Sequence, residues 1–141
     1  MDLAEKILRL AAEHSGRRPE QVDRADIFGA GKLAGDDADE FLDAFIQTYG
    51  VDFTGFRDYL HYDGNEPPGW FRTSWGVGTD GKRLAIVPIS LTDLVRAAKS
   101  GKWQMEYPAH RLVDRGRIYF WIFPLVVLCF VLLIAPWRAS H

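Results

Sequence analysis

The sequence predicts a mainly α-helical bundle with a short β-hairpin or irregular insert near residues 70–89, followed by one C-terminal transmembrane helix. Three stretches repeat apolar residues at the spacing of a helix face, near residues 2–13, 36–49 and 90–100. Two short β-like runs flank a turn signal at residues 79–82. Residues 118–137 carry no charge, and thirteen of these twenty are Leu, Ile, Val or Phe. These observations predict the fold class.

The first helix is expected to begin after Asp2 and to run to about Glu13. An aspartate at this position can accept hydrogen bonds from the free amides of the first turn. Leu3, Ile7 and Leu10 form its apolar stripe. Residues 14–35 then contain many turn and breaker residues with scattered apolar positions, which predicts a long loop.

The second helix is expected to start near Asp36 or Asp37, either of which can serve as its N-cap, and to end at Gly50. Its first turns carry five carboxylates, which suit the positive end of a helix dipole. They are Asp36, Asp37, Asp39, Glu40 and Asp43. Two interpretations stay open: a solvated helix start, or a docking face for a basic protein partner. The cluster lacks the central glycine and late glutamate of a calcium loop, so we predict no metal site.

A short helix is expected to run to Tyr62, followed by a loop and then a hairpin around residues 79–82. The third helix begins at Ser90, where Asp93 completes a capping box, and Gly101 ends it. The predicted domain organisation is therefore a helical domain over 1–103, a basic linker over 104–117, the apolar helix over 118–137 and a tail over 138–141.

The apolar run 118–137 predicts a single membrane-spanning helix, because twenty residues span about 30 Å. Tyr119, Trp121 and Trp137 lie near its ends, where aromatic rings favour the headgroup region. Arg115 and Arg117 precede it, and positive residues stay on the cytoplasmic side. We therefore expect the chain to have the lipid bilayer as a partner, in the inner membrane with its N-terminal domain in the cytoplasm.

Composition disfavours two function classes. Residues 1–117 hold 16 basic and 19 acidic residues, a net charge of −3, which argues against nucleic acid as a partner. An enzyme needs a nucleophile, a base or a metal cluster. The best catalytic candidate is His61 with Asp58 and Asp63, and it matches no known catalytic spacing. We therefore predict no catalytic residues.

One segment resembles a known family. The run KLAGDDADEFLDAFIQTYGVDF, residues 32–53, resembles the part of acyl carrier proteins that leads into their second helix. Together with LTDLVRAAKSGKW, residues 91–103, it resembles an uncharacterised bacterial family, domain of unknown function 1493, over most of residues 3–103. The resemblance implies a small acyl-carrier-protein-like helical bundle with an acidic recognition helix.

The chain differs from acyl carrier proteins at the residue to which those proteins attach their prosthetic group. Those proteins attach 4′-phosphopantetheine to a serine, and the matching position here is Asp37, or Gly35 if the register shifts. Neither residue has a hydroxyl, so we predict no cofactor. The resulting hypothesis is a non-catalytic, membrane-anchored interaction module that docks a basic protein through the acidic helix. The alternatives are an acyl carrier modified at another site, a small membrane enzyme using His61, and an immunity or regulatory membrane protein.

Overall fold

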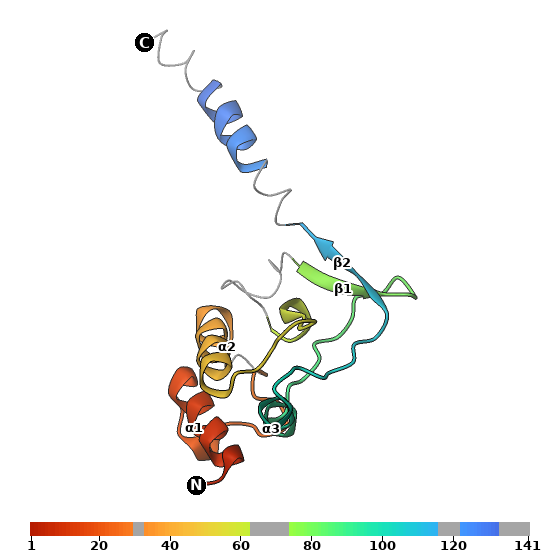
Figure 1. Ribbon diagram of the computed structural model, residues 1–141. Helices are drawn as coiled ribbons and strands as arrows, with labels where there is room; N and C mark the ends of the chain where they lie inside the picture. The colour runs from red at the N-terminus through yellow and green to blue at the C-terminus, as the bar shows by residue number, and fades with distance from the viewer. Residues whose placement is uncertain (30–32, 63–73, 116–121, 133–141) are drawn as a thin grey trace.

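A computed structural model describes residues 1–29, 33–62, 74–115 and 122–132. The α-helices are α1 (Leu3–Ser15), α2 (Gly35–Tyr49) and α3 (Leu91–Ser100), and a further helix covers residues 122–132. Two strands, β1 (Ser74–Gly78) and β2 (His110–Asp114), form an antiparallel sheet. Two short 3₁₀ helices, η1 (Pro19–Gln21) and η2 (Asp58–Leu60), lie in the connections. Figure 1 shows the three labelled helices grouped together, with the sheet at the opposite end of the domain.

The helix boundaries follow mostly from the residues that the sequence singled out. The Asp2 carboxylate accepts from the Glu5 amide at 2.7 Å, and Ser90 and Asp93 cap each other's amides at the start of α3. Gly50 and Gly101 adopt left-handed conformations at the ends of α2 and α3, with φ of 64° and 74°. The N-cap prediction for α2 is wrong. Ala34 occupies that position without a side-chain hydrogen bond, so the helix begins one residue earlier than Asp36.

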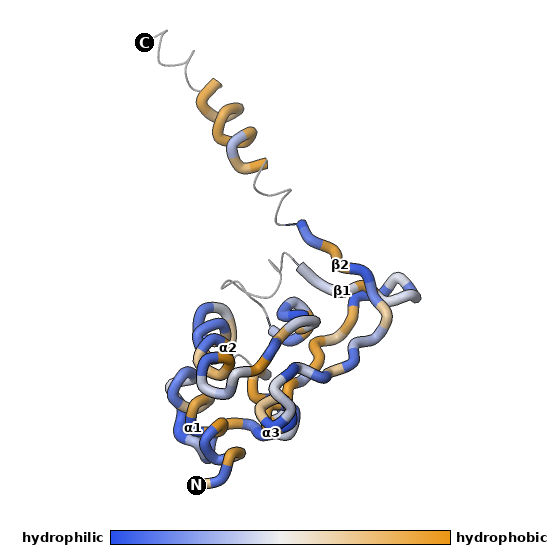
Figure 2. The backbone as a smooth tube through the Cα atoms, in the orientation of Figure 1, coloured by the Kyte–Doolittle hydropathy of each residue, from blue (hydrophilic) through white to orange (hydrophobic). Residues whose placement is uncertain are grey.

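The core forms where α1 packs against both α2 and α3. Its largest fully buried apolar side chains come from all three helices and from the loops between them. They are Phe41, Phe45, Ile7, Ile27, Leu33, Leu60, Ile89 and Leu94. Figure 2 shows hydrophilic and hydrophobic residues alternating along α1 and α2, as expected for helices with one buried face.

The sheet differs from the predicted hairpin. β1 pairs with β2, in the register Trp75↔Val113 and Val77↔Arg111. After the turn the chain pairs with β1 through the antiparallel bridge between Val77 and Arg83, where the Leu84 amide donates to the Gly76 carbonyl at 2.9 Å. The turn itself is present, since the Gly78 amide donates to the Lys82 carbonyl at 2.9 Å. The predicted hairpin is therefore present only as this turn and the Val77–Arg83 bridge. The strand that completes the sheet, β2, lies within residues 104–117, which were predicted to be a linker.

The transmembrane prediction for residues 118–137 is also wrong. Within the described part of the chain, every helix is too short or too polar to cross a bilayer. The helix over 122–132 is apolar, but eleven residues extend only about 16 Å, roughly half of a hydrocarbon core. Residues 118–121 and 133–137 lie outside the described residues. The prediction of a single-pass protein in the inner membrane depended on that helix, so it is wrong as well.

The segments that leave α2 and α3 are joined by backbone hydrogen bonds. The Asp52 amide donates to the Gly101 carbonyl at 2.9 Å, and the Trp103 amide donates to the Asp52 carbonyl at 2.8 Å. Both helices end at left-handed glycines just before this contact. The contact fixes where residues 103–107 enter the domain, and therefore where the buried groups described below are held.

Candidate functional site

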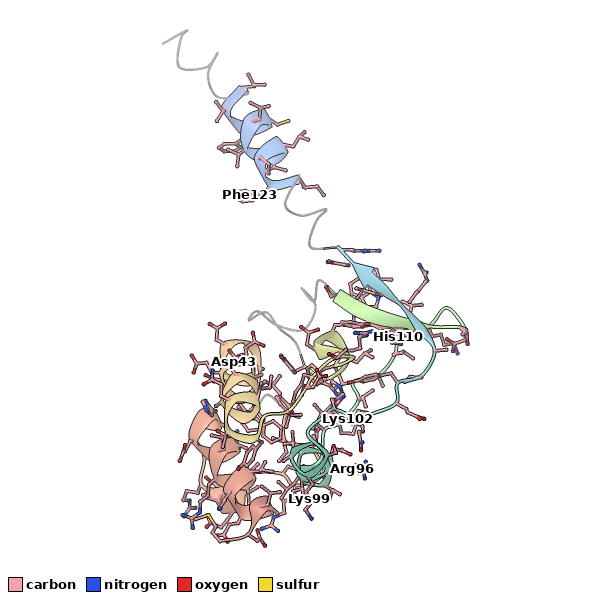
Figure 3. The ribbon with its side chains drawn as sticks, in the orientation of Figure 1. Asp43, Arg96, Lys99, Lys102, His110 and Phe123 are labelled. Carbon is pink, nitrogen blue, oxygen red and sulfur yellow. The ribbon has the colours of Figure 1, made fainter. Side chains whose placement is uncertain are left out.

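Four exposed carboxylates that make no recorded side-chain hydrogen bond among the described residues lie on the first three turns of α2, and we call them the acidic face. Its members are Asp36, Asp37, Glu40 and Asp43. Asp36, Glu40 and Asp43 follow the i, i+4, i+7 spacing, so they lie along one side of the helix over about 10 Å. Figure 3 shows Asp43 on the outer side of α2. This cluster was predicted from the sequence, and the structure leaves all four side chains exposed on α2.

The acidic face is held by the packing of the opposite side of α2. Ala38, Phe41 and Phe45 are fully buried there. The Phe41 ring contacts Phe28 edge-on, with the ring centroids 5.6 Å apart, and also lies beside Phe45. Because large buried rings fix the rotation of the helix about its axis, the four carboxylates keep a constant direction.

Asp39 has a different role from the other carboxylates. Its Oδ1 accepts a hydrogen bond from the Tyr62 hydroxyl at 2.8 Å. Tyr62 is buried, and its ring stacks on Phe28 at 5.3 Å. Burial, and then the hydrogen bond to Asp39, raise the pKa of Tyr62 far above its ordinary value. Asp39 therefore fastens α2 to the segment after η2. All five predicted carboxylates are exposed, but Asp39 differs from the other four because it is hydrogen-bonded within the domain.

The acidic face has no cationic partner among the residues that the structure describes. The ion pairs recorded there join Arg9 to Glu5 and Arg96 to Asp93, and neither involves α2. The positive end of the α2 dipole favours Asp36 and Asp37 but neutralises them only in part. The face is thus an exposed, rigidly supported negative surface.

His61 is a buried structural residue. Its Nδ1 lies 2.8 Å from the Val87 carbonyl oxygen and its Nε2 lies 2.7 Å from the Tyr107 hydroxyl. Because a carbonyl can only accept, Nδ1 carries the proton and Nε2 accepts from Tyr107. The ring also stacks on Phe56, with centroids 5.0 Å apart. Burial lowers the pKa of His61 below its ordinary value, against smaller raising effects from the Val87 carbonyl and nearby carboxylates.

This arrangement leaves His61 without a free nitrogen for catalysis. Asp58, its suggested partner, instead accepts from the Tyr59 amide at 2.8 Å. Asp63 lies outside the described residues. The enzyme hypothesis built on His61 therefore gains no support from the geometry of the described residues.

The remaining predicted site residues fall in two groups. Arg115 is described, and its guanidinium lies 5.4 Å from the centre of the Trp75 ring. This contact lies within the domain and does not test the role that the sequence predicted for Arg115. Tyr119, Trp121, Trp137 and Arg117 lie outside the described residues.

Sequence reasoning missed a second charged surface, on the sheet. Arg83, Arg111 and Arg115 are exposed around the half-buried ring of Trp75, and we call these three residues the arginine face. The Arg83 guanidinium lies 5.0 Å from the centre of that ring. The period-two spacing of Arg111, Val113 and Arg115 could have indicated a strand with arginines on one side.

No protein-family model, curated protein or solved structure matches this chain. The resemblance to acyl carrier proteins and to domain of unknown function 1493 therefore stays a prediction. Asp37, at the position of the carrier serine, lies in the first turn of α2 and is exposed. Across the described ranges, His, Cys, Asp and Glu side chains form no group of three that could hold a metal ion.

Proposed function

We propose that this protein is a non-catalytic interaction module that docks a basic protein through the acidic face. One observation carries the proposal: four exposed carboxylates lie on a firmly packed helix and have no cationic partner among the described residues. A rigid charged surface loses little conformational entropy on binding and gives specificity and fast association with an oppositely charged partner.

Two further features support an interaction role. The Tyr62–Asp39 hydrogen bond fixes α2 against the rest of the domain, which preorganises the acidic face. His61, the best catalytic candidate, is engaged at both ring nitrogens. The family resemblance points the same way, because acyl carrier proteins are recognised through the acidic helix that follows their carrier serine.

The test compares capture of proteins from a cell extract by the full chain and by two variants. The acid-face variant carries Asp36→Asn, Glu40→Gln and Asp43→Asn, and leaves Asp39 unchanged because that residue is structural. The matched control neutralises three exposed carboxylates on other elements, through Glu13→Gln, Glu20→Gln and Glu106→Gln. Both variants lose the same charge.

We expect the acid-face variant to lose its basic binding proteins by about tenfold or more, and the control to retain them. Quantitative mass spectrometry of the captured proteins measures the change, and circular dichroism checks that both variants fold. Equal recovery of every captured protein by the acid-face variant and the wild type would reject docking through this face.

A further inference from the structure

The three residues of the arginine face lie on one side of the sheet. Residues directly opposite in an antiparallel pair share a face, so the pair Val77↔Arg111 places Arg111 on the same side as Val77 and Trp75. Arg115 is the residue after β2, and its guanidinium, 5.4 Å from the centre of the Trp75 ring, lies on the same side. The bridge between Val77 and Arg83 adds Arg83 on the far side of β1. The arginines therefore surround an apolar centre formed by Trp75 and Val77.

Two of these arginines are held in place by the aromatic ring. The guanidinium groups of Arg83 and Arg115 lie 5.0 Å and 5.4 Å from the centre of the Trp75 ring. Cation–π contacts at such distances orient the planar guanidinium while its N–H groups stay available for hydrogen bonds. A fixed guanidinium fork fits a carboxylate through two parallel hydrogen bonds.

The two described acids of the sheet and its turn lie outside the arginine face as defined above. Asp114 lies on the opposite side of β2 from Arg111 and Arg115, by the alternation of a strand. Asp80 lies in the turn after β1, where its carboxylate accepts from the Lys82 amide at 3.0 Å. The arginine face is thus a positive surface on a protein whose overall charge is −2.

The arginine face and the acidic face have similar lengths. Arg111 and Arg115 are separated by about 13 Å along the strand, and Asp36 and Asp43 by about 10 Å along α2. Figure 1 shows α2 and the sheet on different parts of the domain, so one copy does not satisfy its own charges through these two faces.

We propose that the arginine face of one copy binds the acidic face of a second copy of this chain. This inference rests on the proposed function, because it assigns to the same acidic face a local cationic surface on a second copy of the chain, in place of a separate basic protein. The contact is head to tail: each copy uses its acidic face toward one neighbour and its arginine face toward another. The proposal rests on one observation: the acidic face and the arginine face of the chain are both exposed, opposite in charge and similar in length.

Sedimentation velocity of the full chain over a range of concentrations tests the inference. We expect the average mass to rise with concentration at low salt and to fall toward the monomer at high salt. The arginine-face variant carries Arg83→Gln, Arg111→Gln and Arg115→Gln, and its partner is the acid-face variant defined above. Each variant alone should associate at least about tenfold more weakly than the wild type.

Mixing the two variants gives the decisive measurement. Each retains one functional face, so an equimolar mixture should form a one-to-one pair and stop there. The control is Arg96→Gln, Lys99→Gln and Lys102→Gln, which removes three positive charges near α3, away from the sheet in Figure 3, and should associate as the wild type does. All variants keep residues 122–132, so any association through that apolar helix is constant.

Three results would overturn the inference: a wild-type chain that stays monomeric at low salt, a mixture that forms no pair, or a control that weakens association as much as the arginine-face variant. If the triple substitution prevents folding, Arg111→Glu alone repeats the test, since the recorded ring contacts of Trp75 come from Arg83 and Arg115. The proposed function fails by a different result, namely unchanged capture of basic proteins by the acid-face variant.

Discussion

The hydroxyl of Tyr107 joins two buried groups, and its removal should destabilise the domain measurably. It donates to His61 Nε2 at 2.7 Å and accepts from Trp103 Nε1 at 2.9 Å. His61 and Trp103 are only 2% and 8% exposed, so water does not readily replace the lost partner. Tyr107→Phe keeps the ring and removes the oxygen that satisfies both groups.

The expected magnitude follows from the groups left without a partner. An unsatisfied buried donor or acceptor costs about 1–3 kcal/mol. Two such groups give about 2–6 kcal/mol, and we expect about 2–4 kcal/mol because Tyr107 itself is only half-buried. This is a large share of the total stability of a small domain.

Urea unfolding followed by tryptophan fluorescence measures the effect. With a slope of about 2 kcal/mol per molar urea, the midpoint should fall by about 1–2 M while the slope stays constant. Tyr49→Phe is the matched control, because no hydrogen bond links the Tyr49 hydroxyl to another described residue, and it should change stability by less than about 0.5 kcal/mol. A Tyr107→Phe midpoint equal to that of the control would refute the reasoning.

Two further predictions concern stability. Because burial lowers the pKa of His61 from its ordinary value of 6.5, the unfolded chain binds a proton more readily, and stability should fall as pH drops below about 6.5. His61→Gln, which does not titrate, should show a shallower fall of the urea midpoint with pH, and an unchanged pH profile would contradict this cause. Ser90→Ala removes the cap that accepts from the Asp93 amide at 3.2 Å and should cost about 1 kcal/mol, seen as a lower thermal midpoint, whereas a cost near zero would argue against the capping box.

Local signals in the sequence predicted the helices well. Asp2 and Ser90 cap α1 and α3, and Gly50 and Gly101 end α2 and α3, because these effects depend on residues within one turn of the helix end. The charged side of α2 followed from the same periodicity. The exact N-cap of α2 did not follow, since a run of neighbouring aspartates offers several equivalent starts.

Contacts between distant residues could not be predicted from the sequence. The pairing of β1 with β2 competes with a nearby turn signal that favours a local hairpin, and nothing in either strand specifies the distant partner. The hydrogen bonds of His61 likewise join residues 26 and 46 positions away. The apolar composition of residues 118–137 led to the transmembrane prediction, although the helix described within that range is too short to span a bilayer.

The distant pairing of β1 with β2 has a consequence for the order in which the domain assembles. About thirty residues, including all of α3, separate the end of β1 from the start of β2. Bringing such distant ends together carries an entropic penalty that local helix formation does not. We therefore expect the helices to associate early and the two strands to meet late. The arginines around Trp75 would then gather only at the last stage of folding, which delays the exposure of a complete cationic surface in the nascent protein.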